Sequence, residues 1–197
     1  QALGIRYRDW PPYEVLQTGQ MGFFDLLEVK KVEMITDKYY NSGKFVNSMN
    51  YLLTICRDPW ELFVKMAECL LKYQHSKSLL RSEDYYRVIF DLNKENDDEN
   101  RAILADLLRF DYILSNRKGT IPEWLQTENY NSLKARLLCK PNDNSWLKGN
   151  VAGFKINVLR FWQSNEIIQE NTHIFYSLAS PDPVPVRHLE GHDFVPV

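Results

Sequence analysis

The stretch DPWELFVKMAECLL, residues Asp58–Leu71, predicts a helix that begins at a defined residue and buries one face. Asp58 is suited to the N-cap, and Pro59 fits the first helical position because its missing N–H would have no partner there. Glu61, three residues after the cap, completes a capping-box-like arrangement. The apolar residues that follow share one helical face: Leu62, Phe63, Met66, Ala67, Leu70 and Leu71. This segment therefore predicts a helical fold with a packed core.

Helical patterns continue on both sides of this segment. Phe24–Tyr40 is apolar over a wide arc, which predicts burial on more than one side. Lys44–Cys56 carries apolar residues at helical spacing, and Asn41 or Ser42 could cap it. Ser82–Asn93 begins with polar and acidic residues that favour a helix, although its aromatic and β-branched residues leave a strand open. Asp98–Asn116 is the fifth predicted helix.

The pattern changes after residue 119. Thr120–Gly153 predicts irregular structure with one short helix near Ser132–Leu138. Alternating apolar residues over roughly 153–162 and over Thr172–Leu178 predict two strands that pair as a hairpin. The fold class is thus mainly α, a bundle of about five helices with a small C-terminal β-hairpin. We expect an extended lead-in over 1–21, a helical domain with the hairpin over 22–180, and an extended or disordered Pro-rich tail over 181–197.

Composition narrows the class of partner. The chain has 197 residues, 44% hydrophobic and 13% aromatic, which suits a folded domain with a real core. The net charge of -2 and the pI of about 6.1 show no basic excess, so no nucleic-acid partner is expected. No apolar run approaches the roughly 18 residues of a membrane span, so no membrane partner is expected. The start, Gln1–Arg6, has neither a signal-peptide pattern nor a Met, and we expect a fragment of a longer chain.

The spacing of the cysteines does not indicate a disulfide framework. Cys56, Cys69 and Cys139 are odd in number and widely spaced, which predicts free thiols in a reducing, cytoplasmic compartment. Cys56 and Cys69 are interpreted as small buried hydrophobic residues. The sequence also lacks the Cys-x3-Cys-x2-Cys cluster motif, phosphate-binding loops, HExxH and GxSxG. No catalytic, cofactor-binding or metal-binding residue is predicted in this chain.

Weaker candidates for chemistry remain in three places. His188 and His192, with Glu190 between them, would share a helical face, but the neighbouring glycine and prolines favour a flexible tail. The acidic run Asp97, Asp98 and Glu99 is interpreted as solvated charge. The third candidate is a cluster made of Tyr39, Tyr40, Tyr85 and Tyr86 with Glu83 and Asp84. It either lines a pocket or forms the edge of the core, and tyrosines at helical spacing favour the core.

Three segments carry a family resemblance. PYEVLQT (Pro12–Thr18) and YYNSGKF (Tyr39–Phe45), with a later run LLRFDYILSNRKG (Leu107–Gly119), resemble an uncharacterised C-terminal domain of bacterial cobalamin-binding radical S-adenosylmethionine proteins. Such proteins are often labelled similar to the anaerobic magnesium-protoporphyrin IX monomethyl ester oxidative cyclase. The resemblance covers most of Gly4–Leu178. It implies a preceding cobalamin-binding domain and catalytic barrel, with Gln1–Gln20 as the exit from that barrel.

The resemblance also implies what the parent enzyme uses. The parent would bind a 4Fe-4S cluster, S-adenosylmethionine and cobalamin, but none of the three cysteines here matches the cluster motif. The predicted function is therefore an accessory domain, not catalytic alone, of an oxidative cyclase-like or methyltransferase-like enzyme. Its expected partner is the preceding barrel of the same polypeptide. The alternatives are a free-standing helical adaptor that binds another protein and a small enzyme built on the tyrosine and acid cluster.

Overall fold

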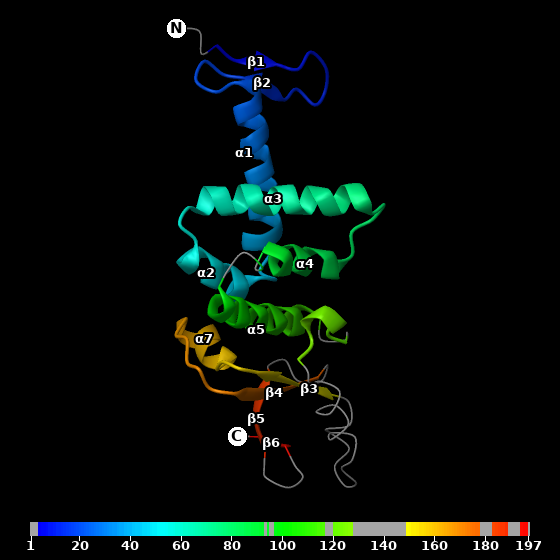
Figure 1. Ribbon diagram of the computed structural model, residues 1–197. Coiled ribbons are helices and arrows are strands. Elements are labelled where there is room, and N and C mark those ends of the chain that lie inside the picture. The colour runs from blue at the N-terminus through cyan, green and yellow to red at the C-terminus, as the bar shows by residue number, and fades with distance from the viewer. Residues whose placement is uncertain are drawn as a thin grey trace.

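The structure, a computed structural model, is mainly α-helical. It describes residues 4–92, 94, 97–116, 120–127, 149–177, 183–188 and 194–196. Figure 1 shows the elements stacked in a column, with a small hairpin at one end and a β-sheet at the other. The six α-helices among the described residues lie between these two ends. The predicted fold class is confirmed.

The helical part contains all five predicted helices. Its elements are β1 (Arg6–Tyr7), β2 (Val15–Gln17), α1 (Phe23–Ile35), the π-helical turn η1 (Thr36–Tyr40), α2 (Val46–Ile55), α3 (Pro59–Ser76), α4 (Ser82–Leu92) and α5 (Asp98–Ser115). β1 and β2 pair antiparallel, so the lead-in that we expected to be extended is a short hairpin. The segment 82–92 is a helix, which decides between the helix and the strand that its sequence left open.

α3 begins as its sequence predicts. The Asp58 carboxylate accepts a hydrogen bond from the backbone N–H of Trp60 at 2.8 Å, and Pro59 occupies the first helical position. Glu61 pairs instead with Lys65 one turn later, at 3.2 Å. One face of α3 is buried against α1 and α4.

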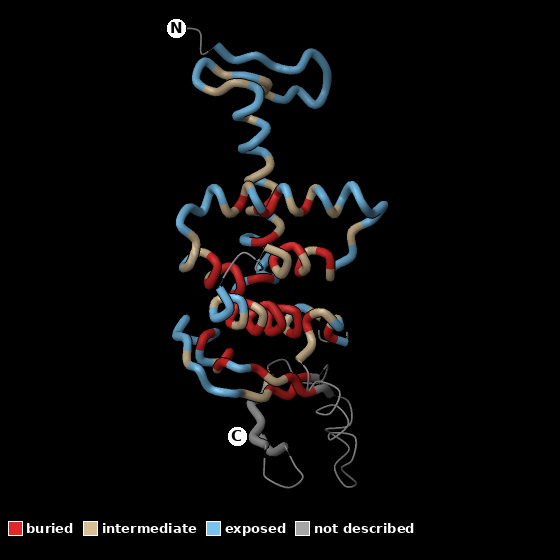
Figure 2. Tube along the Cα trace, in the orientation of Figure 1, coloured by how far each residue is buried: buried red, intermediate tan, exposed pale blue. Residues whose placement is uncertain are grey.

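Aromatic side chains connect the middle layers of the core. The rings of Tyr39 and Phe45 lie 4.9 Å apart, those of Phe45 and Tyr86 4.5 Å apart, and those of Tyr86 and Tyr112 4.9 Å apart, measured between centroids. These four residues come from η1, the start of α2, α4 and α5. Figure 2 shows the buried residues gathered in these layers. Packed aromatic pairs of this kind stabilise by burial and by their ring geometry.

The last part of the chain forms a sheet. Its elements are the 3-10 turn η3 (Glu123–Leu125), β3 (Gly149–Phe154), α7 (Val158–Ser164), β4 (Thr172–Ser177), β5 (Val184–His188) and β6 (Phe194–Pro196). The sheet is antiparallel with the order β3-β4-β5-β6. β3 and β4 pair as the predicted hairpin. Within the Pro-rich segment 181–197, β5 and β6 add two strands to it.

The predicted strand over roughly 153–162 is wrong in its second half. β3 ends at Phe154, and α7 occupies Val158–Ser164. The Asn157 carboxamide accepts a hydrogen bond from the backbone N–H of Arg160 at 3.0 Å, which begins a helix at that point. Phe154, Ile156 and Val158 are all buried, so the alternating pattern did reflect the core but not a continuous strand.

Candidate functional site

An arm projects from the helical body at its N-terminal end. We define the N-terminal arm as residues 4–30, which comprise the β1–β2 hairpin and the first half of α1. Figure 1 shows the hairpin and this part of α1 standing beyond α3, and Figure 2 shows most of their residues exposed. The second half of α1 packs against α3 and delivers Ile35 to the core. Ile35 is the one buried residue of α1, so the structure does not show the predicted burial of this helix on more than one side.

Local bonds hold the arm in shape. The Arg8 N–H donates to the Glu14 carbonyl at 2.9 Å, and Lys30 on α1 pairs with the Glu14 carboxylate at 3.1 Å. Gly4 has a positive φ of 61°, and a Cβ there would lie 3.0 Å from the Cα of Gly19. Glycine at position 4 therefore serves both a backbone conformation and a close approach.

Large apolar side chains are exposed along the whole arm. They are Ile5, Tyr7, Trp10, Tyr13, Phe23, Phe24, Leu27 and Val29. Phe24 is 81% exposed, and no other aromatic side chain among the described residues has a larger exposed fraction. An exposed apolar surface concentrated in one place is typical of a protein or ligand contact, whereas scattered exposed residues are ordinary.

A pocket lies where the hairpin meets α1. It has a volume of about 410 Å³. Its apolar lining is Trp10, Val15, Leu16, Phe23, Leu26 and Leu27. Arg8, Asp9, Glu14 and Lys30 complete it, and the Arg8 guanidinium lies 5.9 Å from the Trp10 ring. The arrangement resembles a contact site with an apolar centre and a charged border.

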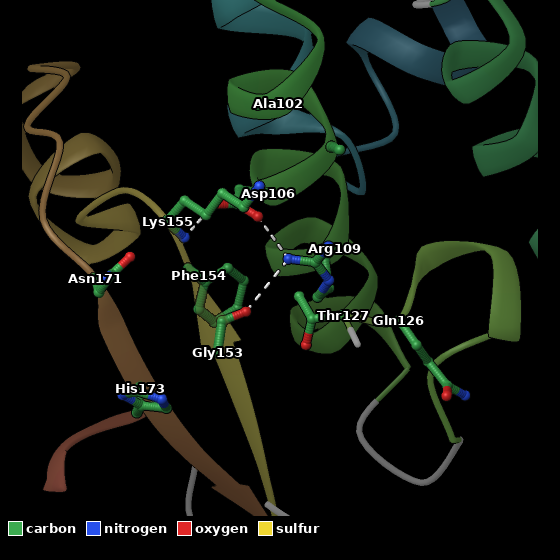
Figure 3. A pocket seen from close by; sticks show the side chains of 11 residues that line it. Ala102, Asp106, Arg109, Gln126, Thr127, Gly153, Phe154, Lys155, Asn171 and His173 are labelled. Carbon is green, nitrogen blue, oxygen red and sulfur yellow. Dashed lines mark hydrogen bonds and ion pairs between the residues drawn. The ribbon is translucent and has the colours of Figure 1, made fainter. Parts of the chain in front are cut away.

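A second cavity lies at the other end of the molecule, between α5 and the sheet. Its volume is about 490 Å³. Asp106 and Arg109 of α5 are both buried and form an ion pair at 2.6 Å. Figure 3 shows this pair beside β3, with Lys155 and Asn171 on one side of the cavity and Gln126 and Thr127 on the other.

The Asp106–Arg109 pair fastens three segments together. Arg109 donates to the Leu125 carbonyl at 2.6 Å and to the Gly153 carbonyl at 3.3 Å. Asp106 accepts from the backbone N–H of Lys155 at 2.5 Å. The pair therefore occupies backbone groups at the end of β3 that a neighbouring strand would otherwise bond, which fixes the sheet against α5.

Residues 1–175 match the model of a family described as a protein of unknown function, DUF4080. The chain belongs to this family. No curated protein and no solved structure matches it.

The tyrosine cluster of this DUF4080 member belongs mostly to the core. Tyr39 and Tyr86 are buried, and the Tyr39 hydroxyl donates to the Tyr85 carbonyl at 3.1 Å. Burial raises the pKa of Tyr86 to about 12. Tyr40 points away, with more than half of its surface exposed. The structure therefore does not bring these four hydroxyls together.

The acidic residues beside the cluster have structural partners. Asp84 is buried, pairs with Lys77, and accepts from the backbone N–H of Arg81 at 2.7 Å at the start of α4. Neither Glu83 nor Tyr85 lines either of the two cavities described above. The small-enzyme alternative predicted a pocket built on these residues, and these two cavities do not provide it.

The described cysteines are half-buried thiols. Cys56 and Cys69 are free, and burial raises the pKa of each thiol. A raised pKa lowers the thiolate fraction, so neither is an activated nucleophile. Cys139 lies outside the described residues.

The acidic run at the start of α5 serves the helix. Asp97 caps the helix by accepting a hydrogen bond from the backbone N–H of Asn100 at 2.8 Å. Asp98 forms an ion pair with Arg101 at 3.3 Å, and Glu99 accepts a hydrogen bond from the Gln169 side chain at 2.8 Å.

Among residues that the structure describes, no group of three or more His, Cys, Asp or Glu side chains could hold a metal ion. Glu190 and His192 lie outside these residues, and only the backbone of His188 is described, in β5. Nor is any helix in the described part of the chain long and apolar enough to cross a bilayer.

Sequence reasoning missed the buried charges on α5. Asp106, Arg109 and Asp111 share one helix, and all three are almost fully inaccessible to solvent. The signal was present, because charged residues interrupt the apolar face of a predicted core helix at these positions. Such interruptions indicate buried charges with partners elsewhere in the chain, but the sequence does not say where.

Proposed function

We propose that this chain is an accessory helical domain that docks through its N-terminal arm on the catalytic barrel of a cobalamin-dependent radical S-adenosylmethionine enzyme. The observation that carries the proposal is the exposed apolar surface of the arm, together with the 410 Å³ pocket at its base. Removing such a surface from water contributes roughly 25 cal/mol for each Å² buried. A domain that presents it gains free energy from a partner.

The geometry supports docking more directly than catalysis. In the tyrosine and acid cluster, the Tyr39 hydroxyl is engaged in a core bond and the Asp84 carboxylate in a capping bond and an ion pair. The arm, by contrast, carries an apolar surface on a hairpin and a helix that are joined by local bonds. Such preformed surfaces bind with little ordering cost.

The nature of the partner rests on the sequence. PYEVLQT lies in the arm itself, at Pro12–Thr18, and YYNSGKF joins η1 to the start of α2. Both resemble the domain that follows the barrel in cobalamin-binding radical enzymes. In this proposal the 4Fe-4S cluster, S-adenosylmethionine and cobalamin belong to the preceding part of the enzyme, and reaction type and substrate follow from that part.

A binding experiment with paired variants tests the proposal. The segment encoded immediately upstream of Gln1 is expressed separately, and its affinity for this chain is measured by calorimetry. Phe24→Asp places a charge on the arm, and Leu79→Asp, in the turn between α3 and α4, is the control. The two side chains are 81% and 82% exposed, so neither substitution disturbs the core.

We expect Phe24→Asp to weaken binding by at least about tenfold and Leu79→Asp to leave it unchanged. Equal effects of the two variants would contradict docking through the arm. An upstream sequence that begins with a start codon and lacks Cys-x3-Cys-x2-Cys would overturn the radical-enzyme assignment. That outcome would favour the free-standing adaptor.

A further inference from the structure

One face of α1 is buried at its C-terminal end and exposed at its N-terminal end. Phe24, Glu28, Lys31 and Ile35 follow one another at intervals of three and four residues, which places them on the same face of the helix. Ile35 is fully buried in the part of α1 that packs against α3. Phe24, three turns earlier, is exposed. The face of α1 that meets the body therefore continues into the arm as an exposed surface.

Trp60, in the first turn of α3, lies beside this exposed part. Its indole N–H donates to the Glu28 carboxylate at 2.8 Å, and Glu28 is one helical turn from Phe24. Trp60 is itself 44% exposed. Figure 1 shows α3 crossing α1 with the arm standing beyond it. We define the α1–α3 surface as Phe24, Glu28 and Trp60, which joins the arm to the body.

The Glu28 carboxylate has no cation as a partner in the part of the chain that the structure describes. Lys30 pairs with Glu14 of the hairpin at 3.1 Å, and Lys31 forms no ion pair with Glu28. The Trp60 indole is a neutral donor, so it satisfies one hydrogen bond and leaves the charge. A carboxylate beside two exposed aromatic side chains is complementary to a cation carried on an apolar surface.

We infer that the α1–α3 surface binds a segment of the docking partner that presents apolar side chains with a lysine or arginine next to them. The cation pairs with Glu28, and the apolar side chains cover Phe24 and the exposed part of Trp60. The inference rests on the proposed function, because the partner is the one that docks on the arm. It adds a contact on the body and a charge requirement. None of the three residues lines the pocket at the base of the arm.

Partner segments of other chemistry fit this surface less well. A wholly apolar segment would remove water from Glu28 without supplying a charge, which costs free energy. An acidic segment would meet Glu28 with a like charge, which opposes association. A lysine or arginine supplies a charge-assisted hydrogen bond at the same position.

Calorimetry tests the charge requirement, with the segment encoded immediately upstream of Gln1 as the probe. Glu28→Gln removes the charge but keeps an oxygen that can accept from the Trp60 indole. We expect the affinity to fall about threefold to tenfold in about 0.01 M salt, and the difference from the native chain to shrink in about 1 M salt, where ions screen the pair. Glu33→Gln is the matched control. Glu33 is exposed on the opposite side of α1 from Phe24, so we expect unchanged binding.

Trp60→Ala tests the contact on the body without changing the charge. We expect at least about fivefold weaker binding because a large aromatic side chain is lost from the contact. Circular dichroism of each variant checks that the helices are retained. If Phe24→Asp weakens binding while Glu28→Gln and Trp60→Ala bind as the control does, the inference is overturned and docking through the arm stands. If Phe24→Asp also binds as the native chain does, the proposed function fails as well. An effect of Glu28→Gln that is equal at both salt concentrations would overturn the pairing with a cation.

Discussion

Asp111 joins two helices through one carboxylate. It lies on α5, fully buried, and its oxygens accept from the backbone N–H groups of Asn47 and Ser48 at 3.2 and 2.8 Å. These two N–H groups belong to the first turn of α2, which has no capping side chain of its own. The expectation that Asn41 or Ser42 caps α2 is therefore wrong. The cap comes from a residue 63 and 64 positions away.

The ionisation of Asp111 makes stability depend on pH. Burial raises its pKa to about 6 from the ordinary value of 3.8, against the lowering effect of its hydrogen bonds. The folded state thus holds the proton over a range where the unfolded state has released it. The contribution of Asp111 to stability is full below about pH 4 and is lost as pH rises through about 6.

Asp111→Asn reveals this dependence, because an amide does not titrate. We expect the free energy of unfolding of the native chain, relative to Asp111→Asn, to fall by about 2 kcal/mol between pH 4.5 and pH 7. Urea unfolding of both proteins at the two pH values measures it. A difference that stays constant with pH, or grows, would contradict the assignment.

The attachment of the sheet to α5 illustrates how a helix and a strand are held by charge. α5 carries two Asp–Arg pairs with the same spacing, Asp98–Arg101 and Asp106–Arg109. The first is exposed and the second is buried. Sequence spacing is identical, so the two pairs differ in their burial and in the backbone groups of η3 and β3 that Asp106 and Arg109 also bond.

Removing one partner from each pair measures that difference. Arg109→Met leaves the Asp106 charge buried without its main partner, and we expect a loss of about 3–5 kcal/mol in the free energy of unfolding. Arg101→Met should cost less than about 1 kcal/mol because water screens the exposed pair. Chemical denaturation of the two variants compares them directly. Similar losses would show that the buried pair does not fasten the sheet.

The helices could be predicted from the sequence because their signals are local. Asp58, Pro59 and the apolar spacing that follows define α3 without reference to the rest of the chain. The sheet was predicted less well, because the alternation through Phe154, Ile156 and Val158 describes burial on two different elements. The strands β5 and β6 lie close together in the sequence, but their proline-rich composition conceals them. The hydrogen bonds from α2 to Asp111 could not be predicted either, because no local sequence pattern indicates a contact between residues so far apart.

At the level of the complete chain, we expect the arm and the body to be separable. The buried core begins at Ile35, and no residue of the hairpin belongs to it. The side-chain hydrogen bond from the Trp60 indole of α3 to Glu28 of α1, at 2.8 Å, also connects the arm to the body. The expected division at residues 21 and 180 stays a prediction, as does the cytoplasmic location.

Deleting residues 1–22 tests this separation. We expect the truncated chain to unfold cooperatively, with a free energy of unfolding within about 1 kcal/mol of the intact chain, because none of the described residues 4–22 is buried. Thermal and urea unfolding of the two chains provide the comparison. A large loss of stability would show that the hairpin is part of the folding unit and not a projecting contact surface.

The π-helical turn η1 sets the rotation of α1, and with it the arm, relative to the rest of the helical body. α1 passes directly into Thr36–Tyr40, and the Asn41 N–H reaches back five residues to the Thr36 carbonyl at 2.9 Å. Each residue of an α-helix advances the chain by about 100°. Removing a single residue from this turn would therefore rotate the whole of α1 by about 100° relative to α2, which moves the buried Ile35 together with the arm. A partner that contacts both the arm and the body would therefore bind only when the two surfaces have the relative orientation that η1 gives them.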